Sequence, residues 1–367
     1  NRKKQNKKSD YYDYNLVAVI VLLVCFGLVM LYSTSSYMAE VNYGNDMFYF
    51  KKQALISAAC LIGALFISKI LDYHVLLPFT TALYVASLIL MGLVRTPLGH
   101  SSHGATRWLY IGPINFQPAE LAKIAVIIMM AYMIGKMGRK VKTLKSCMIL
   151  GLPGAGLALA AYILTDNLST AIIILGIAVT LIFVASPRYA QFIWMAVSGV
   201  GFMGIFLALE SYRLERLAIW RNPEKYEKGY QTLQGLYAIG SGGLFGRGLG
   251  NSVQKLGFLP EAQNDMIFSI VCEELVLVGA GTIIVLFLIL IWRFFVIATH
   301  APDLFGALIA VGAMAHMMIQ VILNIAVVTN SIPNTGITLP FISYGGTSVV
   351  FLLLEMGLVL SISRLVQ

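Results

Sequence analysis

Residues 266–292 read MIFSIVCEELVLVGAGTIIVLFLILIW, an almost unbroken run of apolar side chains. A helix needs about 20 mostly apolar residues to cross the hydrocarbon core of a bilayer, and this run is long enough to do so. The apolar residues are continuous and do not alternate with polar ones, which excludes a strand of a membrane β-barrel. The run therefore predicts a transmembrane α-helix.

The composition extends this interpretation to the whole chain. Of its 367 residues, 58% are hydrophobic and 12% are charged, and the mean hydropathy is +0.80. A soluble globular domain carries about 25% charged residues, so we expect an all-α polytopic membrane protein with one membrane domain over residues 1–367. Ten segments are predicted to span the bilayer, namely 15–36, 53–69, 74–94, 119–136, 145–165, 168–186, 190–209, 266–292, 304–329 and 345–363.

The positive charges predict which ends of the spans face the cytoplasm. Short cytoplasmic loops are enriched in Lys and Arg, and here both the tail 1–14 and the turn 136–145 are basic. We therefore expect a multi-pass protein with both termini in the cytoplasm. These basic loops account for the net charge of +9, so the charge does not indicate nucleic-acid binding.

Three longer connections are predicted to meet on the opposite, outer face. The largest, residues 210–265 between the seventh and eighth spans, exceeds the usual length of a connection. It is rich in aromatic, aliphatic and glycine residues, a composition that is not typical of disorder. We expect it to fold against the outer membrane face. The other two are the polar loops 95–118 and 330–344.

Asp265 immediately precedes the 266–292 span and has two interpretations. An Asp at the start of a helix commonly caps it, by accepting a backbone hydrogen bond in the favourable field of the helix dipole. A carboxylate at the boundary between water and membrane can also act as a general base. Replacement by Asn distinguishes the two, because Asn still caps a helix but cannot take up a proton.

Glu273 and Glu274 lie roughly 12–14 Å deeper in the same helix, at ~1.5 Å per residue. Two carboxylates that act together on one glycosidic bond lie within about 5–9.5 Å of each other, so neither can form such a pair with Asp265. Carboxylates inside a membrane are functional or paired. We favour structural pairing for both.

Glu120 and Lys123 are three residues apart in QPAELAKIAVIIMM, a spacing that places both on one face of a helix. An ion pair at the helix start and a contact with substrate are equally open interpretations. In the last two spans, His316, Asn324 and Glu355 are predicted to be buried polar groups with partners on other helices.

Positive charge also gathers in the outer loops. Arg107 is closely followed by Trp108 and Tyr110, which indicates either a site for an anionic headgroup or an ordinary anchor at the membrane interface. The four cysteines form no close pair, and His100 with His103 provides too few ligands, so no metal site is predicted. The further cations of this face are Arg213, Arg216, Arg221, Arg247 and Lys255. These residues leave an enzyme acting on an anionic lipid and a transporter of such a lipid as alternatives.

Three long blocks carry a resemblance to a known family. They are RWLYIGPINFQPAELAK, GYQTLQGLYAIGSGGLFGRGLGNSVQKLGFLPEAQNDMIFSIVCEEL and NTGITLPFISYGGTS. Their order and the ten predicted spans resemble the SEDS proteins (shape, elongation, division and sporulation) over essentially the whole chain. Within that family, the motifs LPEA and LPFISYGG are more similar to those of FtsW and its sporulation relative than to those of RodA.

The resemblance implies a peptidoglycan glycosyltransferase of the bacterial cytoplasmic membrane, acting at its outer face in septal wall synthesis. Such enzymes polymerise lipid II into β-1,4 glycan strands and work with a class B penicillin-binding protein and other division proteins. The resemblance also implies that Asp265 is the catalytic residue. With cations and loop residues of the outer face added, the candidate substrate-binding residues are Arg107, Glu120, Lys123, Arg213, Arg216, Lys255, Glu261 and Ser343.

The sequence departs from the family pattern beside Asp265. Gln263, Asn264 and Met266 stand where the family commonly has His, Thr and Phe, which indicates that those His and Thr residues are not the catalytic groups.

The donor sugar of lipid II is α-linked and the product is β-linked, so the implied reaction inverts the anomeric carbon and needs one base. The leaving pyrophosphate needs charge stabilisation, from loop cations or from a divalent cation such as Mg²⁺ or Mn²⁺. The alternatives to an enzyme are a lipid II flippase, which would use the intramembrane charges, and a scaffold that only activates its partner.

Overall fold

The computed structural model describes most of the chain and confirms a helical membrane protein. The described residues are 12–102, 105–111, 114–186 and 211–366. Within them, eight helices are long and apolar enough to cross a membrane. They are α1 (Tyr14–Tyr43), α2 (Phe48–Ile70), α4 (Pro118–Met137), α5 (Leu144–Thr165), α6 (Leu168–Ala185), α10 (Ile267–His300), α11 (Leu304–Val328) and α12 (Gly346–Arg364).

The remaining two predicted spans have different outcomes. The segment 74–94 begins with a short 3-10 turn, Tyr73–Leu76, and continues as the apolar helix α3 (Thr80–Leu93), which is shorter than predicted. The segment 190–209 lies outside the described residues.

The segment 95–118, which the sequence predicted only as a polar outer loop, contains an antiparallel sheet. Its strands are β1 (Gly99–Ser102), β2 (Ala105–Ile111) and β3 (Ile114–Phe116), in the order β1-β2-β3. Leu109 pairs with Gly99 on one side and with Phe116 on the other. The Thr347 hydroxyl at the start of α12 donates to the Asn115 carbonyl at 2.6 Å. The sheet is therefore fastened to the last helix.

The long connection before α10 is also folded. It contains α8 (Ser211–Arg221) and α9 (Tyr230–Ser241), and the chain then turns back along α10. The backbone N–H groups of Arg247 and Gly248 donate to the carbonyls of Glu273 and Glu274, each at 2.9 Å. The helical backbone of α10 is broken two residues later, at Val276. The loop thus supplies donors to carbonyls next to a break in the helix.

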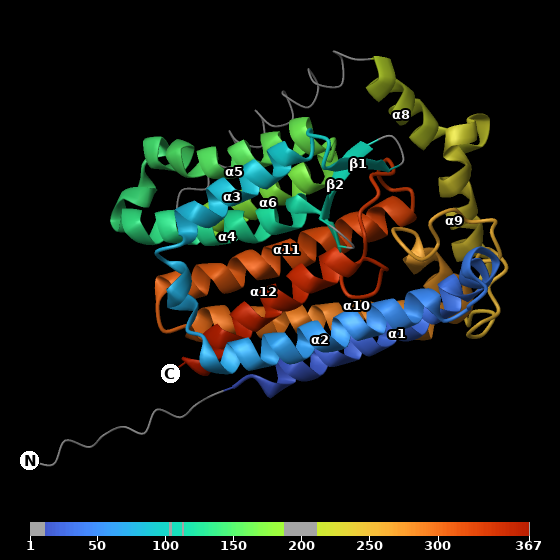
Figure 1. The fold of residues 1–367 in the computed structure, drawn as a ribbon, viewed down its shortest axis with the longest axis horizontal. Helices are drawn as coiled ribbons and strands as arrows, with labels where there is room; N and C mark the ends of the chain where they lie inside the picture. Colours follow the sequence, from blue (N-terminus) through green and yellow to red (C-terminus); the bar gives the residue numbers. More distant parts are fainter. Residues whose placement is uncertain (1–11, 103–104, 112–113, 187–210, 367) are drawn as a thin grey trace, which may run out of the picture.

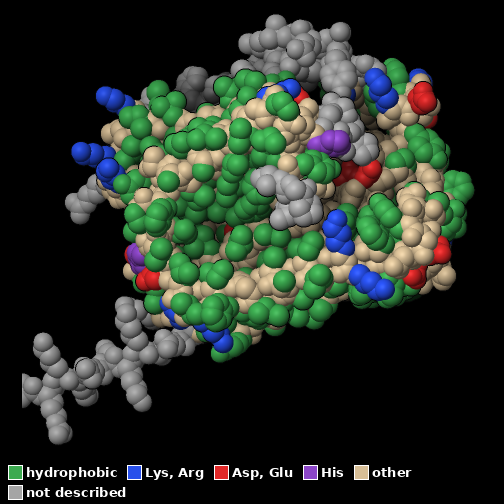
Figure 2. Space-filling model, viewed as in Figure 1, with side chains coloured by type: hydrophobic (Ala, Val, Ile, Leu, Met, Phe, Trp, Pro, Cys, Tyr) green, Lys and Arg blue, Asp and Glu red, His purple; other side chains and the backbone are tan. Residues whose placement is uncertain are grey.

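Figure 1 shows how this arrangement positions the connections: α1 begins and α12 ends at one end of the bundle, whereas β1, β2, α8 and α9 lie at the other. At the first end, Arg293 of α10 pairs with the buried Asp13 at 2.6 Å, and the backbone N–H of Asp13 donates to the Ser363 hydroxyl of α12 at 3.3 Å. Hydrophobic side chains cover much of the flank between the two ends, while charged ones gather towards the ends (Figure 2). This distribution fits a multi-pass membrane protein.

Candidate active site

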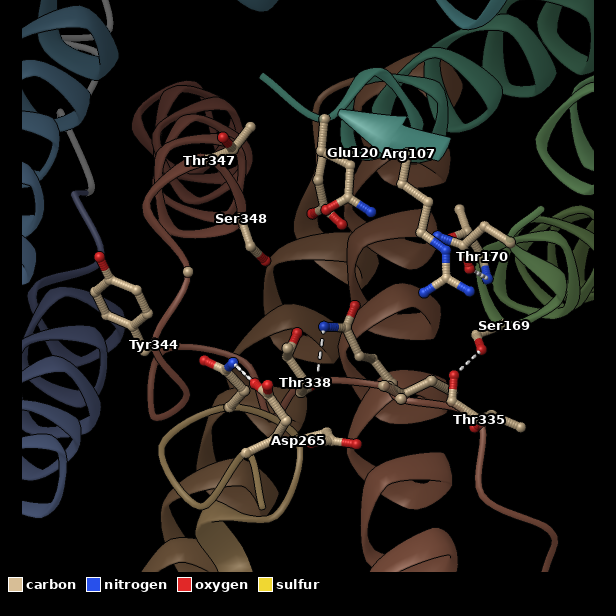
Figure 3. Close-up of a pocket in the computed structure, with 18 of the residues that line it drawn as sticks. Arg107, Glu120, Ser169, Thr170, Asp265, Thr335, Thr338, Tyr344, Thr347 and Ser348 are labelled. Carbon is tan, nitrogen blue, oxygen red and sulfur yellow. Dashed lines mark hydrogen bonds between the residues drawn. The ribbon is translucent and has the colours of Figure 1, made fainter. Parts of the chain in front are cut away.

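A cavity of about 1120 Å³ opens among the connections at the end of the bundle that carries the sheet. Its walls come from β2, the starts of α4 and α6, α8, α9, and the segments just before α10 and α12. Figure 3 shows Asp265 on one side of this space, with Glu120 and Arg107 opposite. Small-molecule sites commonly occupy about 300–1,000 Å³, so there is room here for a large ligand.

Asp265 is a buried carboxylate in this cavity, with 7% of its surface exposed. Burial, and then the charge of Glu261, raises the pKa of Asp265 to about 7. The amide Nε2 of Gln231 donates to its Oδ1 at 3.4 Å. Asn324 of α11 donates to its backbone carbonyl at 2.9 Å. The raised pKa brings this carboxyl into the range in which it can exchange a proton near neutral pH, which suits general-base catalysis.

The helix-cap interpretation of Asp265 is wrong. Helix α10 begins at Ile267, and Met266 occupies the cap position without a side-chain hydrogen bond to the helix. The Asp265 carboxylate therefore lies one residue too early to serve as the cap, and its side chain faces the cavity instead.

Of the two open interpretations of Glu120 and Lys123, the structure shows the ion pair. The two side chains lie 3.0 Å apart at the start of α4, where both are buried and line the cavity. Lys123 also donates to the side-chain Oε1 of Gln320 on α11 at 3.1 Å, and the Gln320 Nε2 donates to the backbone carbonyl of Thr338 at 3.1 Å. The ion pair thus continues into a network that joins α4, α11 and the segment before α12.

Arg107 projects from β2 into the cavity, where it donates to the Asp166 carbonyl at 3.0 Å. Burial lowers the pKa of Arg107, and the neighbouring charge of Arg216 acts in the same direction. Asp166 opposes both effects. The remaining cationic side chains of the lining are Lys52, Lys123 and Lys228. Two guanidinium groups that line one cavity form a suitable site for an anion.

Lys255 lies away from this cavity. Its ammonium group is buried and pairs with Glu274 at 2.7 Å, and it also donates to the Ser33 hydroxyl of α1 at 3.0 Å. Glu273 accepts from the Ser252 hydroxyl and from the backbone N–H of Val253. The two glutamates therefore have structural partners, as favoured above, and together they fix the loop to α10.

The other candidates are spread between the cavity and its surroundings. Glu261 lines the cavity and accepts a hydrogen bond from the Asn264 amide. Ser343 is buried outside the described lining, where its hydroxyl accepts from the backbone N–H of Leu339 at 2.8 Å. Arg213 lies in α8, and its side chain is outside the described part of the chain. The Glu355 carboxylate accepts from His316, which confirms the predicted interhelical pairing.

Several uncharged side chains of the lining were not singled out from the sequence. Ser169 of α6 donates to the Thr335 carbonyl at 2.5 Å, and Asn334 donates to Gln231 at 3.1 Å. Asn334 lies within the NTGITLPFISYGGTS block, and Gln231 lies within the block that begins GYQTLQ. Their position in these two blocks is the sequence feature that could have marked them as candidate site residues. Among the described residues, no three His, Cys, Asp or Glu side chains gather closely enough to hold a metal ion.

Comparison with known proteins identifies the family of this chain. The family of cell cycle proteins that comprises FtsW, RodA and SpoVE matches residues 13–367. The chain belongs to this family. Among curated members of the FtsW/RodA/SpoVE family, stage V sporulation protein E of Bacillus subtilis is 37% identical, over 96% of this chain and 97% of that protein. A probable peptidoglycan glycosyltransferase FtsW of Geobacter metallireducens is 36% identical, over 99% and 97%.

Solved structures with the same architecture are known. A chain of a peptidoglycan synthase complex superposes with a TM-score of 0.78 at 26% identity, over 96% of this chain and 98% of that chain. RodA of Thermus thermophilus superposes with a TM-score of 0.69 at 27% identity, over 96% and 97%. The fold and the family of this chain are therefore established together.

Proposed function

We propose that this protein is a peptidoglycan glycosyltransferase that polymerises lipid II into β-1,4 glycan strands. The observation that carries the proposal is the buried Asp265, with a pKa raised to about 7, in a large cavity that also holds Arg107 and Arg216. A base works best when its pKa is close to the working pH, and guanidinium groups suit a pyrophosphate. The names of the FtsW relatives support the same activity.

The proposed reaction is a single inverting displacement. Asp265 takes the proton of the acceptor 4-hydroxyl while that oxygen attacks the anomeric carbon of the donor. The bond between this carbon and the phosphate oxygen breaks, and its electron pair leaves with undecaprenyl pyrophosphate. Arg107 and Arg216 stabilise the charge that develops on the leaving group. A covalent sugar intermediate is not needed, because one displacement turns the α-linkage into a β-linkage.

The proposal includes a location and a partner. The basic tail 1–14 and the basic turn 136–145 support a cytoplasmic position for both termini, and the cavity at the opposite end of the bundle would then face outward. Residues 1–367 act as one membrane domain, in septal wall synthesis. A class B penicillin-binding protein would crosslink the product; the similarity to a chain of a peptidoglycan synthase complex supports this partner.

A lipid II flippase is less well supported. Such a transporter would use intramembrane carboxylates, but these have partners: Glu120 pairs with Lys123, Glu274 with Lys255, and Glu355 with His316. Asp265 lies outside the membrane helices, before the start of α10, and its pKa is raised to about 7.

The test is polymerisation of labelled lipid II by the purified protein together with its penicillin-binding protein partner. We expect Asp265→Asn to fold, to bind the partner and to form no polymer, because an amide cannot accept the proton. Near-normal polymer from this variant would refute the assignment of the base. Normal growth of cells that carry only Asp265→Asn would favour the scaffold alternative, and transfer of lipid II across vesicles by the protein alone would favour the flippase.

A further inference from the structure

Three hydrogen bonds in sequence connect the backbone before α12 to the Asp265 carboxylate. The backbone N–H of Gly336 donates to the Asn334 Oδ1 at 3.0 Å. The Asn334 Nδ2 donates to the Gln231 Oε1 at 3.1 Å. The Gln231 Nε2 then donates to the Asp265 Oδ1 at 3.4 Å. All four residues line the cavity.

The direction of these three hydrogen bonds follows from the backbone N–H of Gly336, which begins the series. A backbone N–H can only donate, so the atom of Asn334 that faces it must be the carbonyl oxygen. The Asn334 NH₂ group is then the one that faces Gln231, which requires the Gln231 carbonyl oxygen on that side. The Gln231 NH₂ group is left to face Asp265.

A second contact supports the same orientation of Gln231. Its Nε2 also lies 3.4 Å from the backbone carbonyl of Pro260, a group that can only accept. If the amide were reversed, the Gln231 oxygen would face both this carbonyl and the Asp265 carboxylate. Contacts at both ends of the side chain therefore point its donor towards Asp265.

We propose that Gln231 and Asn334 are positioning residues for Asp265, which form a relay that holds an amide donor against the carboxylate oxygen. The inference rests on the proposed role of Asp265 as the base. The relay joins α9, the segment 334–336 and Asp265, which lies two residues before the start of α10, so it also fixes where the carboxylate lies relative to its surroundings in the cavity.

The relay would act on the ionised form of the base, because an amide donor stabilises a carboxylate more than a neutral carboxyl. The Gln231 contact lowers the pKa of Asp265, against the larger raising effects of burial and of Glu261. The other charged groups that line the same cavity are Lys52, Arg107, Glu120, Lys123, Arg216 and Lys228.

The experiment measures the rate of lipid II polymerisation against pH for the complex with its partner. Gln231→Leu removes the donor and should raise the pKa of Asp265. The acid limb of the profile, where the rate falls as the pH decreases, should therefore move to higher pH by about 0.5–1 unit. Asn334→Ala removes the hydrogen bond that orients the Gln231 amide, and should move the acid limb in the same direction by a smaller amount. Since Asn334 reaches Asp265 only through Gln231, the double variant should shift no further than Gln231→Leu.

Gln117→Leu is the matched control, because Gln117 lines the same cavity from the start of α4 and undergoes the same substitution. Its acid limb should stay at the wild-type pH, whatever happens to the rate. If Gln231→Leu does not fold, Asn334→Ala alone decides the question.

The outcomes separate the relay from the proposed function. An inactive Asp265→Asn together with wild-type acid limbs in Gln231→Leu and Asn334→Ala would overturn the relay and leave the function intact. Polymer formation by Asp265→Asn would overturn the function itself. Additive shifts in the double variant would show that Asn334 acts independently of Gln231, and would also overturn the relay.

Discussion

Lys255 of the outer loop and Glu274 of α10 form a buried ion pair, with 2.7 Å between the ammonium nitrogen and the carboxylate oxygen. The Ser33 hydroxyl of α1 contacts both partners, since it donates to the carboxylate and accepts from the ammonium. A lysine that the sequence offered for a substrate anion thus neutralises an acid of the protein itself. The pair joins three segments that are far apart in the chain.

Replacing Lys255 tests this structural role. Lys255→Met should destabilise the protein by roughly 3–5 kcal/mol, because removal of one partner leaves a buried carboxylate without its cation. The thermal unfolding of the purified protein in detergent measures the effect.

The double variant Lys255→Met/Glu274→Gln is the control for Lys255, since it removes the uncompensated charge together with the cation. It should recover much of the stability and also the polymerisation activity. A stable but inactive double variant would instead show that Lys255 contributes directly to the reaction.

Asp265 is predicted to reduce the stability of the protein at neutral and higher pH. The pKa of Asp265 is about 7 in the folded protein against an ordinary value of 3.8, so the folded state holds this proton more tightly than the unfolded state does. Stability from this group is present at low pH and is lost as the pH rises through 7. Asp265→Asn should therefore unfold at a higher temperature than the wild type at pH 8, with a smaller difference at pH 5, where the wild-type carboxyl is protonated. An equal difference at both pH values would contradict the raised pKa.

Glu261 should set the pH at which the enzyme becomes active. Its charge raises the pKa of Asp265, second only to burial. Glu261→Gln removes this charge and should move the acid limb of the polymerisation profile to lower pH, by about half a unit. This direction is opposite to that expected for Gln231→Leu, so the two variants check each other. A shift of Glu261→Gln to higher pH would show that Glu261 acts on Asp265 by another route.

Arg107 should contribute to stabilising the leaving pyrophosphate. Arg107→Gln is expected to lower kcat/KM for lipid II by about 10²-fold, the usual loss when one group that stabilises developing charge is removed. Arg95→Gln is the matched control: Arg95 begins the same 95–118 segment and pairs with Asp166 at 2.9 Å, but it is not among the residues that line the cavity. We expect the control to polymerise at nearly the wild-type rate. Equal losses in both variants would indicate that the effect passes through Asp166.

Gly246 should tolerate no side chain, because the loop lies directly on α10 at this point. Its φ is +80°, and a Cβ built on it would lie 2.2 Å from the Glu274 carbonyl oxygen. Gly243 also has a positive φ, of +61°, but a Cβ there meets nothing within 4 Å. Gly243→Ala should therefore cost only about 1 kcal/mol of backbone strain. Gly246→Ala should cost several times more, measured by thermal unfolding. Similar losses for the two would argue against close packing of the loop on α10.

The membrane helices could be predicted from the sequence because an apolar run of sufficient length has few other uses. The ends of these helices were harder to predict: α10 continues to His300, beyond the predicted end at 292, and its Arg293 pairs with the acidic Asp13. The small sheet of 95–118 was missed, since its register depends on pairing between short strands that carry little alternation of apolar and polar residues.

The candidate site was predictable only in part. Carboxylates, lysines and arginines attract attention in an apolar chain, so Asp265, Glu120, Lys123 and Arg107 could be singled out, and they do share one cavity. The partner of Lys255 could not be identified, because Glu274 was assigned to a span and the lysine to a loop. Gln231 was overlooked because an uncharged amide gives no sign in the sequence of what it contacts.

The hydrogen-bond chain to Asp265 starts at a backbone amide, and this has a consequence for how the site can change by mutation. Every residue except proline supplies a backbone N–H, but Gly336 has a φ of +68°, a conformation that strains any residue with a side chain. The orientation of the two amide side chains thus depends on a main-chain conformation that favours glycine. Genetic variation that weakens the relay is expected to be concentrated in three codons, those of Gly336, Asn334 and Gln231.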